Sequence, residues 1–148
     1  THTFSKIYGL AGFRIGYGIG KESIINKISR LRAPFNVNSI ACEAAYLALN
    51  KSSFMKKSLS LNKTCLEYIY NSLTEMKVNY IPSQGNFVFI YFKKPANQIA
   101  FKLLKKGIIV RYLESFGFPN AIRVSTGTLS ETKLFIKSLK QLLSEEKL

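Results

Sequence analysis

The stretch Thr3-Phe4-Ser5-Lys6-Ile7-Tyr8-Gly9-Leu10-Ala11-Gly12-Phe13-Arg14-Ile15-Gly16-Tyr17 decides how the rest of the sequence is interpreted. It sets a lysine beside small and hydroxylated residues, and a glycine-bracketed apolar turn then brings one arginine back toward it. An apolar setting and a neighbouring cation both favour the neutral, nucleophilic amine of a lysine, which can form a Schiff base. The guanidinium of Arg14 and the hydroxyls of Ser5 and Thr3 suit a phosphate monoester. The alternative is a surface lysine followed by a glycine-rich strand.

Length, composition and charge limit the class of protein. The chain has 148 residues, one domain's worth, and 47% of them are hydrophobic, too many for a disordered segment. Apolar runs such as residues 7–19 are interrupted, so none reaches the roughly 18 residues that a membrane span needs. The net charge of +14 raises nucleic acid or an anionic membrane as partners. Because the lysines are scattered, the sequence favours neither partner, and a basic nucleic-acid-binding module stays only as an alternative.

Several kinds of site are excluded by the residues that the chain lacks. The sequence has no Asp and one His, so neither a Ser-His-Asp triad nor a metal site built on aspartates or histidines fits within it. We therefore expect no metal. Cys42 and Cys65 show no CxxC spacing, which indicates reduced core thiols of a cytoplasmic protein. Gly18-Ile19-Gly20-Lys21 fails as a phosphate loop because Ile15 and Glu22 stand where that motif needs other residues.

The apolar spacing along the chain predicts an α/β region. We expect strands at residues 13–19, 78–81, 86–92, 108–111 and 121–125, where β-formers lie between glycine and proline turns. We expect helices at residues 22–32, from Ser39 onward, at 54–76, at 95–106 and from Ser130 to about Ser144. The hydroxyls of Ser39 and Ser130 are expected to cap their helices.

The order of residues around Lys6 closely resembles the lysine signature of the fold-type I pyridoxal-phosphate aminotransferases, in which Arg follows eight positions after the Lys. Within that class the sequence is most similar to histidinol-phosphate aminotransferases. Three further segments agree in order: residues 34–39, 82–87 and 107–128. The resemblance implies the C-terminal part of the PLP-dependent transferase fold. It would comprise an edge of the large cofactor-binding domain at 1–35, connecting helices at 36–76 and a small α/β domain at 77–148.

The resemblance also implies roles for the residues of the lysine segment. Lys6 would hold pyridoxal 5'-phosphate as a Schiff base and then act as the general base at the substrate's Cα. Ser5 and Arg14 would bind the phosphate of the cofactor, with Thr3 as a weaker candidate for the same role.

Two arginines complete the set of predicted site residues. By resemblance, Arg123 would bind the anionic group of the substrate, either a carboxylate or a phosphate, with Arg111 as a helper. The residue types alone support the same interpretation, because arginines twelve positions apart on neighbouring strands can share one anion pocket. The alternative for Arg111 is a salt bridge to a glutamate. Tyr8, Tyr17, Asn38 and Asn86 lie inside the matched segments and His2 precedes the first of them, and we assign no chemistry to these residues.

The activity implied by the resemblance is transfer of an amino group between histidinol phosphate and 2-oxoglutarate or glutamate, in histidine biosynthesis. The implied protein is a cytoplasmic homodimer with small-molecule substrates. A threonine-phosphate decarboxylase or an aromatic aminotransferase of the same subgroup is the alternative. In the resembling family an Asp upstream of the lysine pairs with the pyridine nitrogen, and this chain has no Asp. We therefore expect an incomplete C-terminal portion with little or no transaminase activity by itself.

Overall fold

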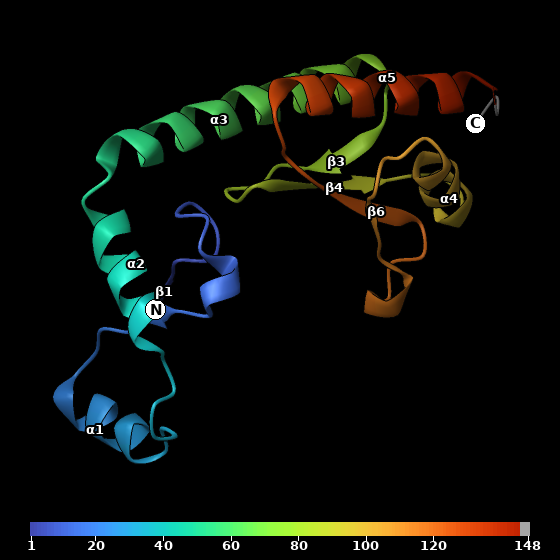
Figure 1. The fold of residues 1–148 in the computed structure, drawn as a ribbon. Coiled ribbons are helices and arrows are strands. Elements are labelled where there is room, and N and C mark those ends of the chain that lie inside the picture. Colours follow the sequence, from blue (N-terminus) through green and yellow to red (C-terminus); the bar gives the residue numbers. More distant parts are fainter. Residues whose placement is uncertain (146–148) are drawn as a thin grey trace. The chain divides into compact units, whose positions relative to one another are not determined.

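Residues 60–145 form a four-stranded antiparallel sheet backed by helices (Figure 1). The structure is a computed structural model that describes residues 1–145, and the chain divides into two units, Thr1–Leu59 and Ser60–Leu148. In the second unit the strands follow the order β3-β4-β6-β5, and every neighbouring pair is antiparallel. The strands are β3 (Asn79–Ile81), β4 (Phe87–Tyr91), β5 (Arg111–Tyr112) and β6 (Ala121–Ser125). The helices are α3 (Ser52–Glu75), which begins in the first unit, α4 (Asn97–Lys105), the 3-10 turn η2 (Glu114–Phe116) and α5 (Leu129–Glu145).

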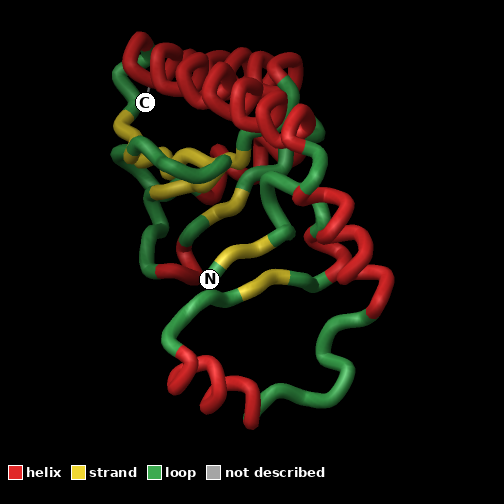
Figure 2. The backbone as a smooth tube through the Cα atoms, turned by 90° about the vertical axis from the view of Figure 1, so that its left-hand side faces the viewer, coloured by secondary structure: helices red, strands yellow, loops and turns green. Residues whose placement is uncertain are grey.

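One face of this sheet is buried under the helices. Val88 and Ile90 of β4 and Ile122 and Val124 of β6 are all buried. They pack against apolar residues of the three helices, namely Leu66, Ile69, Leu73, Ala96, Ile99, Leu103, Phe135, Ile136, Leu139 and Leu142. Figure 1 shows α3 in green and α5 in orange and red lying side by side above the strands, and Figure 2 shows the same layering after a quarter turn. Each fully buried Leu or Ile contributes about 1.5–3 kcal/mol, so this face holds the unit together.

The opposite face of the sheet is open within the unit. Successive residues of a strand point to opposite faces, so Phe87, Phe89 and Tyr91 of β4 lie on this face together with Arg123 and Ser125 of β6. These five side chains are exposed or half-buried, in contrast to their buried neighbours. We call them the open face of the sheet.

The first unit is built from shorter elements. The two-residue strands β1 (His2–Thr3) and β2 (Gly16–Tyr17) pair antiparallel, and the 3-10 turn η1 (Ala11–Phe13) lies between them in the chain. A Cβ at Gly16 would lie 2.6 Å from the backbone oxygen of His2, so this pairing requires a glycine. The helices α1 (Glu22–Arg30) and α2 (Ser39–Leu49) follow. No residue of α1 is buried, although Ile24 and Ile28 line one side of it.

Most of the predicted elements are confirmed, including the strands at 78–81, 86–92 and 121–125 to within a residue or two. The predicted strand at 13–19 is wrong in extent, since only Gly16–Tyr17 pair. Arg14 adopts a left-handed backbone conformation, with φ at 53°, which turns the chain and shortens the strand.

The predicted strand at 108–111 is also wrong in extent, because β5 covers only Arg111–Tyr112. The end of α4 explains the difference. Gly107 has a φ of 77° and donates its N–H to Leu104, while the N–H of Ile108 donates to Leu103 at 2.9 Å. These two bonds form a Schellman motif, which ties Ile108 to the helix end and delays the strand.

Both predicted helix caps are wrong by one or two residues. The side chain of Asn38, and not Ser39, accepts the N–H of Ala41 at 2.8 Å at the start of α2. At the start of α5, Thr128 takes the place expected of Ser130. The carboxylate of Glu131 accepts the N–H of Thr128 at 2.7 Å, and the hydroxyl of Thr128 accepts the N–H of Glu131 at 3.3 Å. This reciprocal pair is a capping box, which uses two donors that the helix end would otherwise leave unpaired.

The prediction of two core thiols is half confirmed. Cys65 is buried in α3, and its thiol lies 3.6 Å from the backbone oxygen of Gly127. Cys42 is exposed, because α2 turns Ala41 and Ala45 inward and leaves the adjacent position on the outer side. Within residues 1–145, no helix has both the length and the apolar character needed to cross a membrane.

Candidate functional site

The Lys6 segment is a tight turn that follows β1. The backbone oxygen of Lys6 accepts the N–H of Gly9 at 2.9 Å, and the φ of 70° at Gly9 is one that glycine adopts without a steric penalty. Phe4 anchors the turn, since its ring is buried and contacts Tyr8 with 4.9 Å between the ring centres. The Lys6 side chain is exposed and makes no hydrogen bond or ion pair with any residue from 1 to 145. The apolar setting expected for this amine is therefore not present within the unit.

Three predicted phosphate ligands lie in the same segment. The N–H of Phe4 donates to the backbone oxygen of Ile15 at 3.2 Å, so Ser5 and Arg14 flank one backbone hydrogen bond. Thr3 joins them, because its hydroxyl accepts the N–H of Ser5 at 3.0 Å. The donor set of one guanidinium and two hydroxyls fits a phosphate monoester.

The backbone at Arg14 is strained. Its φ of 53° is uncommon for a residue with a side chain and costs about 1–2 kcal/mol relative to the right-handed region. One guanidinium nitrogen, Nη1, donates to the backbone oxygen of Ala11 at 2.6 Å, which fixes where the side chain leaves the turn. Strain of this kind is typical of functional sites, and here it coincides with a predicted ligand.

Arg111 and Arg123 face each other across two strands. They are direct partners in the antiparallel pairing of β5 with β6, so both side chains project from the open face with their Cβ atoms about 4.5–5.5 Å apart. The sequence prediction that these arginines lie on neighbouring strands is confirmed. Neither forms an ion pair with any carboxylate that the structure describes, so the salt bridge considered as an alternative for Arg111 is not found there. Like charges placed directly opposite each other are destabilising, which makes this pair a candidate anion site.

Aromatic rings surround the two arginines. The guanidinium carbon of Arg123 lies 5.4 Å from the ring centre of Phe87, and that of Arg111 lies 5.6 Å from the ring centre of Phe116. On the same face, Phe89 contacts Phe118 edge-to-face with 5.3 Å between the ring centres. The open face therefore combines two unpaired cations with rings that hold them and shape the surface around them.

Asn62, a polar residue that no sequence motif marks, links the elements of this face by hydrogen bonds. The side chain of Asn62 on α3 donates to the backbone oxygen of Gly85 at 3.2 Å and accepts the hydroxyl of Thr126 at 2.8 Å. Thr126 also donates its N–H to the backbone oxygen of Asn86 at 2.9 Å. The start of β4, which carries Phe87, and the end of β6, two residues after Arg123, are thereby linked to the helix.

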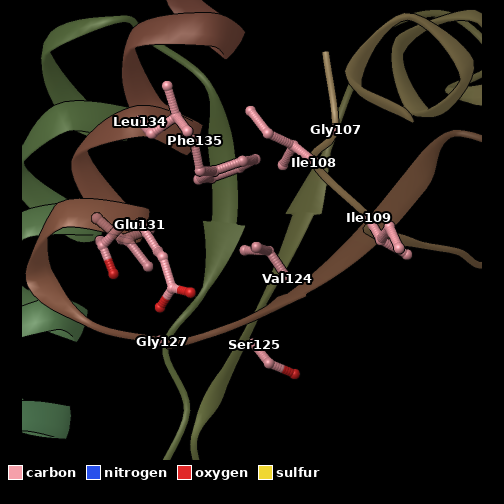
Figure 3. Close-up of a pocket in the computed structure, with 11 residues that line it drawn as sticks. Gly107, Ile108, Ile109, Val124, Ser125, Gly127, Glu131, Leu134 and Phe135 are labelled. Carbon is pink, nitrogen blue, oxygen red and sulfur yellow. The ribbon is translucent and has the colours of Figure 1, made fainter. Parts of the chain in front are cut away.

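The pocket in Figure 3 lies away from the predicted residues. It has a volume of about 290 Å³ and is lined by Ile69, Gly107, Ile108, Ile109, Val124, Ser125, Gly127, Glu131, Thr132, Leu134 and Phe135. Val124 points into it from the helix-covered side of β6, whereas Arg123 precedes Val124 and points to the other side. No predicted site residue lines this pocket. In residues 1–145, no three His, Cys or Glu side chains gather in a way that could hold a metal ion.

Two pKa shifts lie outside the candidate site. The backbone N–H and hydroxyl of Thr128 both bond to the Glu131 carboxylate and lower its pKa. Burial, followed by the nearby charge of Glu114, raises the pKa of Tyr112. Each shift has a local structural cause, and neither group belongs to the predicted ligand sets.

The predicted residues fall into two groups in two units. Thr3, Ser5, Lys6 and Arg14 belong to Thr1–Leu59, while Arg111 and Arg123 belong to Ser60–Leu148. Each group contains an arginine, whose guanidinium suits a phosphate or a carboxylate. Solved structures similar to this chain include aminotransferases. A putative histidinol-phosphate aminotransferase from Erwinia carotovora atroseptica superimposes with a TM-score of 0.89 at 26% identity, over 99% of this chain and 42% of that one.

Three further comparisons narrow the class of enzyme. The histidinol-phosphate aminotransferase of Sinorhizobium meliloti, solved in complex with pyridoxal-5'-phosphate, gives a TM-score of 0.85 at 28% identity, over 97% of this chain and 40% of that one. The histidinol-phosphate aminotransferase of Caldicellulosiruptor saccharolyticus is 52% identical over 141 residues, or 95% of this chain and 39% of the relative. The family model for aminotransferase class I and II matches residues 1–139. The chain belongs to this family, and it spans about two fifths of the length of the curated relatives it matches.

Proposed function

We propose that this chain provides the lysine-bearing and substrate-anion-binding parts of an aminotransferase that exchanges an amino group between histidinol phosphate and 2-oxoglutarate, with pyridoxal 5'-phosphate as cofactor. The observation that carries the proposal is the pairing of Arg111 with Arg123 on the open face. Support for the particular substrate comes from the relative of that name at 52% identity.

The paired arginines suit the two substrates of such a reaction. Histidinol phosphate presents a phosphate, and glutamate presents a carboxylate at its far end. A guanidinium binds either anion through two parallel N–H groups, so one site serves both half-reactions. An anion between Arg111 and Arg123 also removes the repulsion that the empty pair carries.

The Lys6 segment carries the second set of proposed ligands. Ser5 and Arg14 would hold the phosphate of the cofactor, and Thr3 would orient the N–H of Ser5 by the bond it already makes. When bound, pyridoxal phosphate supplies an electron sink for the carbanion at the substrate's Cα. The Nζ atom of Lys6 would take the proton from that Cα. Arg123 would hold the substrate by its anionic end.

The composition of the chain leads to a second part of the proposal. The printed sequence contains no Asp to pair with a pyridine nitrogen, and the stripe of Ile24 and Ile28 on α1 is exposed. We propose that these 148 residues alone have little or no transaminase activity. We also propose that the complete protein is a cytoplasmic homodimer, with residues 1–35 in its large domain, 36–76 as connecting helices and 77–148 as its small domain.

The experiment uses the complete gene product loaded with pyridoxal phosphate. Histidinol phosphate and 2-oxoglutarate are supplied together, and glutamate is measured as the product. We expect glutamate to form only when both substrates are present, and Lys6→Ala to abolish its formation. Release of carbon dioxide from threonine phosphate without any 2-oxo acid would instead identify a decarboxylase and contradict the proposal.

A further inference from the structure

We propose that Phe87 and Phe116 are positioning residues, which hold the guanidinium groups of Arg123 and Arg111 in place for a shared anion. The inference deepens the proposed function and rests on it, since it takes the two arginines as the ligands of the substrate's anion. It names residues that act through the arginines and need not touch the substrate.

The two rings approach the arginine pair from different elements. Phe87 lies on β4, two residues before Phe89, which is the direct partner of Arg123 across the strands. Phe116 lies in η2, which follows β5 and its Arg111. Each guanidinium carbon lies within 5.6 Å of its own ring centre, inside the range of a cation–π contact.

The exposure of the rings argues against a role in the core. Phe87 is 37% exposed and Phe116 is 59% exposed, so neither ring belongs to the buried cluster of the unit. An exposed large apolar side chain has little stability to offer through burial. On this face, each ring makes its stabilising contact with an arginine.

The turn before β4 leaves room for the Phe87 ring. A Cβ added at Gly85 would lie 3.2 Å from this ring, which is tighter than an ordinary van der Waals contact. The backbone oxygen of Gly85 is held by Asn62, so the turn cannot easily move away. The glycine thus lets the ring take its position beside Arg123.

Fixing these side chains before binding has a physical benefit. A free arginine has many rotamers, and ordering it when the anion arrives weakens binding. Without the rings, the repulsion between the two guanidinium groups would also turn them away from each other into solvent. Each ring attracts its guanidinium, and both cations therefore stay on the open face. The conformational entropy that the arginine side chains lose when the anion binds is then smaller.

The experiment measures binding of inorganic phosphate to the 148-residue chain by NMR, through the side-chain Nε–H signals of the arginines. We expect Phe87→Leu and Phe116→Leu each to weaken binding about two- to five-fold, the range that an exposed cation–π contact supports. Phe87→Tyr keeps an aromatic face and should restore wild-type affinity. In the absence of phosphate, Phe87→Leu should also move the Arg123 signal, since the ring current is lost.

The chain contains a matched control. Phe101 on α4 is 51% exposed and carries Lys105 at 4.6 Å from its ring centre, so it offers a cation–π contact outside the open face. Phe101→Leu should leave phosphate affinity unchanged. Wild-type affinity in Phe87→Leu, combined with lost binding in Arg123→Met, would overturn this inference alone. No phosphate binding by the wild type, or unchanged binding in Arg123→Met, would overturn both the inference and the anion role in the proposed function.

Discussion

Removing one of the opposed arginines should change anion binding without destabilising the fold. The two arginines are direct cross-strand partners, and we take a guanidinium separation of roughly 6–8 Å in a solvated setting with a dielectric constant near 80. Their repulsion is then about 0.5–0.7 kcal/mol. Arg123→Met relieves it but forfeits the contact with Phe87, worth about 0.5–1 kcal/mol. The two effects nearly cancel, so the free energy of unfolding should change by less than about 0.5 kcal/mol.

A double-mutant cycle with Arg111→Met isolates the repulsion. Urea unfolding of the wild type, both single variants and the double variant, followed by circular dichroism, gives the coupling between the two positions. We expect a coupling of about 0.5–0.7 kcal/mol with the sign of a repulsive pair, which saturating phosphate should reverse. A loss above about 2 kcal/mol in either single variant would refute the argument, because it exceeds what an exposed cation–π contact contributes. A coupling of attractive sign without phosphate would equally refute the argument.

Three substitutions and one labelling experiment test the architecture of the two units. Asn62→Leu removes both side-chain bonds to Gly85 and Thr126 and should cost about 1–3 kcal/mol in urea unfolding, with Asn62→Asp as the milder control. Gly16→Ala places a Cβ against the oxygen of His2, so hydrogen exchange in β1 and β2 should accelerate; protection equal to the wild type would contradict this. Glu131→Gln should destabilise at neutral pH, because the wild-type carboxylate has a lowered pKa in the folded state and contributes stability above its ordinary pKa. That difference should vanish as the pH falls through the folded pKa, and a difference that persists in acid would count against it. A thiol reagent should label Cys42 in the folded protein and Cys65 only in urea; equal rates at both would be the opposite result.

The elements that the sequence predicted well are those with a strong and uninterrupted pattern. β6 was predicted at 121–125 because its buried residues alternate with Arg123 and Ser125 and a loop precedes it. The 24 residues of α3 contain no glycine or proline, so its apolar spacing was easy to follow. The strand at 108–111 failed because Ile108, Ile109 and Val110 are strong β-formers whose first N–H is taken by the end of α4. The β-strand propensity of these residues carries no information about the hydrogen bond that Ile108 makes to the end of α4.

The candidate site was predictable in its charged residues and not in its supporting contacts. Lys6, Arg14 and Arg123 stand at fixed spacings that a sequence displays directly. The pairing of Arg111 with Arg123 follows once both strands are known, although the exact register needs the structure. The contact of Phe87 with Arg123 depends on side-chain rotamers, and Asn62 reaches the 85–86 turn across 23 residues of chain. No local sequence pattern marks the Phe87 contact or the reach of Asn62.

The most direct test of the central claim is to find which lysine holds the cofactor. The complete gene product is loaded with pyridoxal phosphate, reduced with borohydride and digested, and the labelled peptide is identified by mass spectrometry. This chain contains 17 lysines, so the position of a single label is informative. We predict a pyridoxyl label on Nζ of Lys6, with no labelled peptide in Lys6→Ala. A label on another lysine, or an unlabelled Lys6 in a protein that transfers amino groups at full rate, would contradict the account.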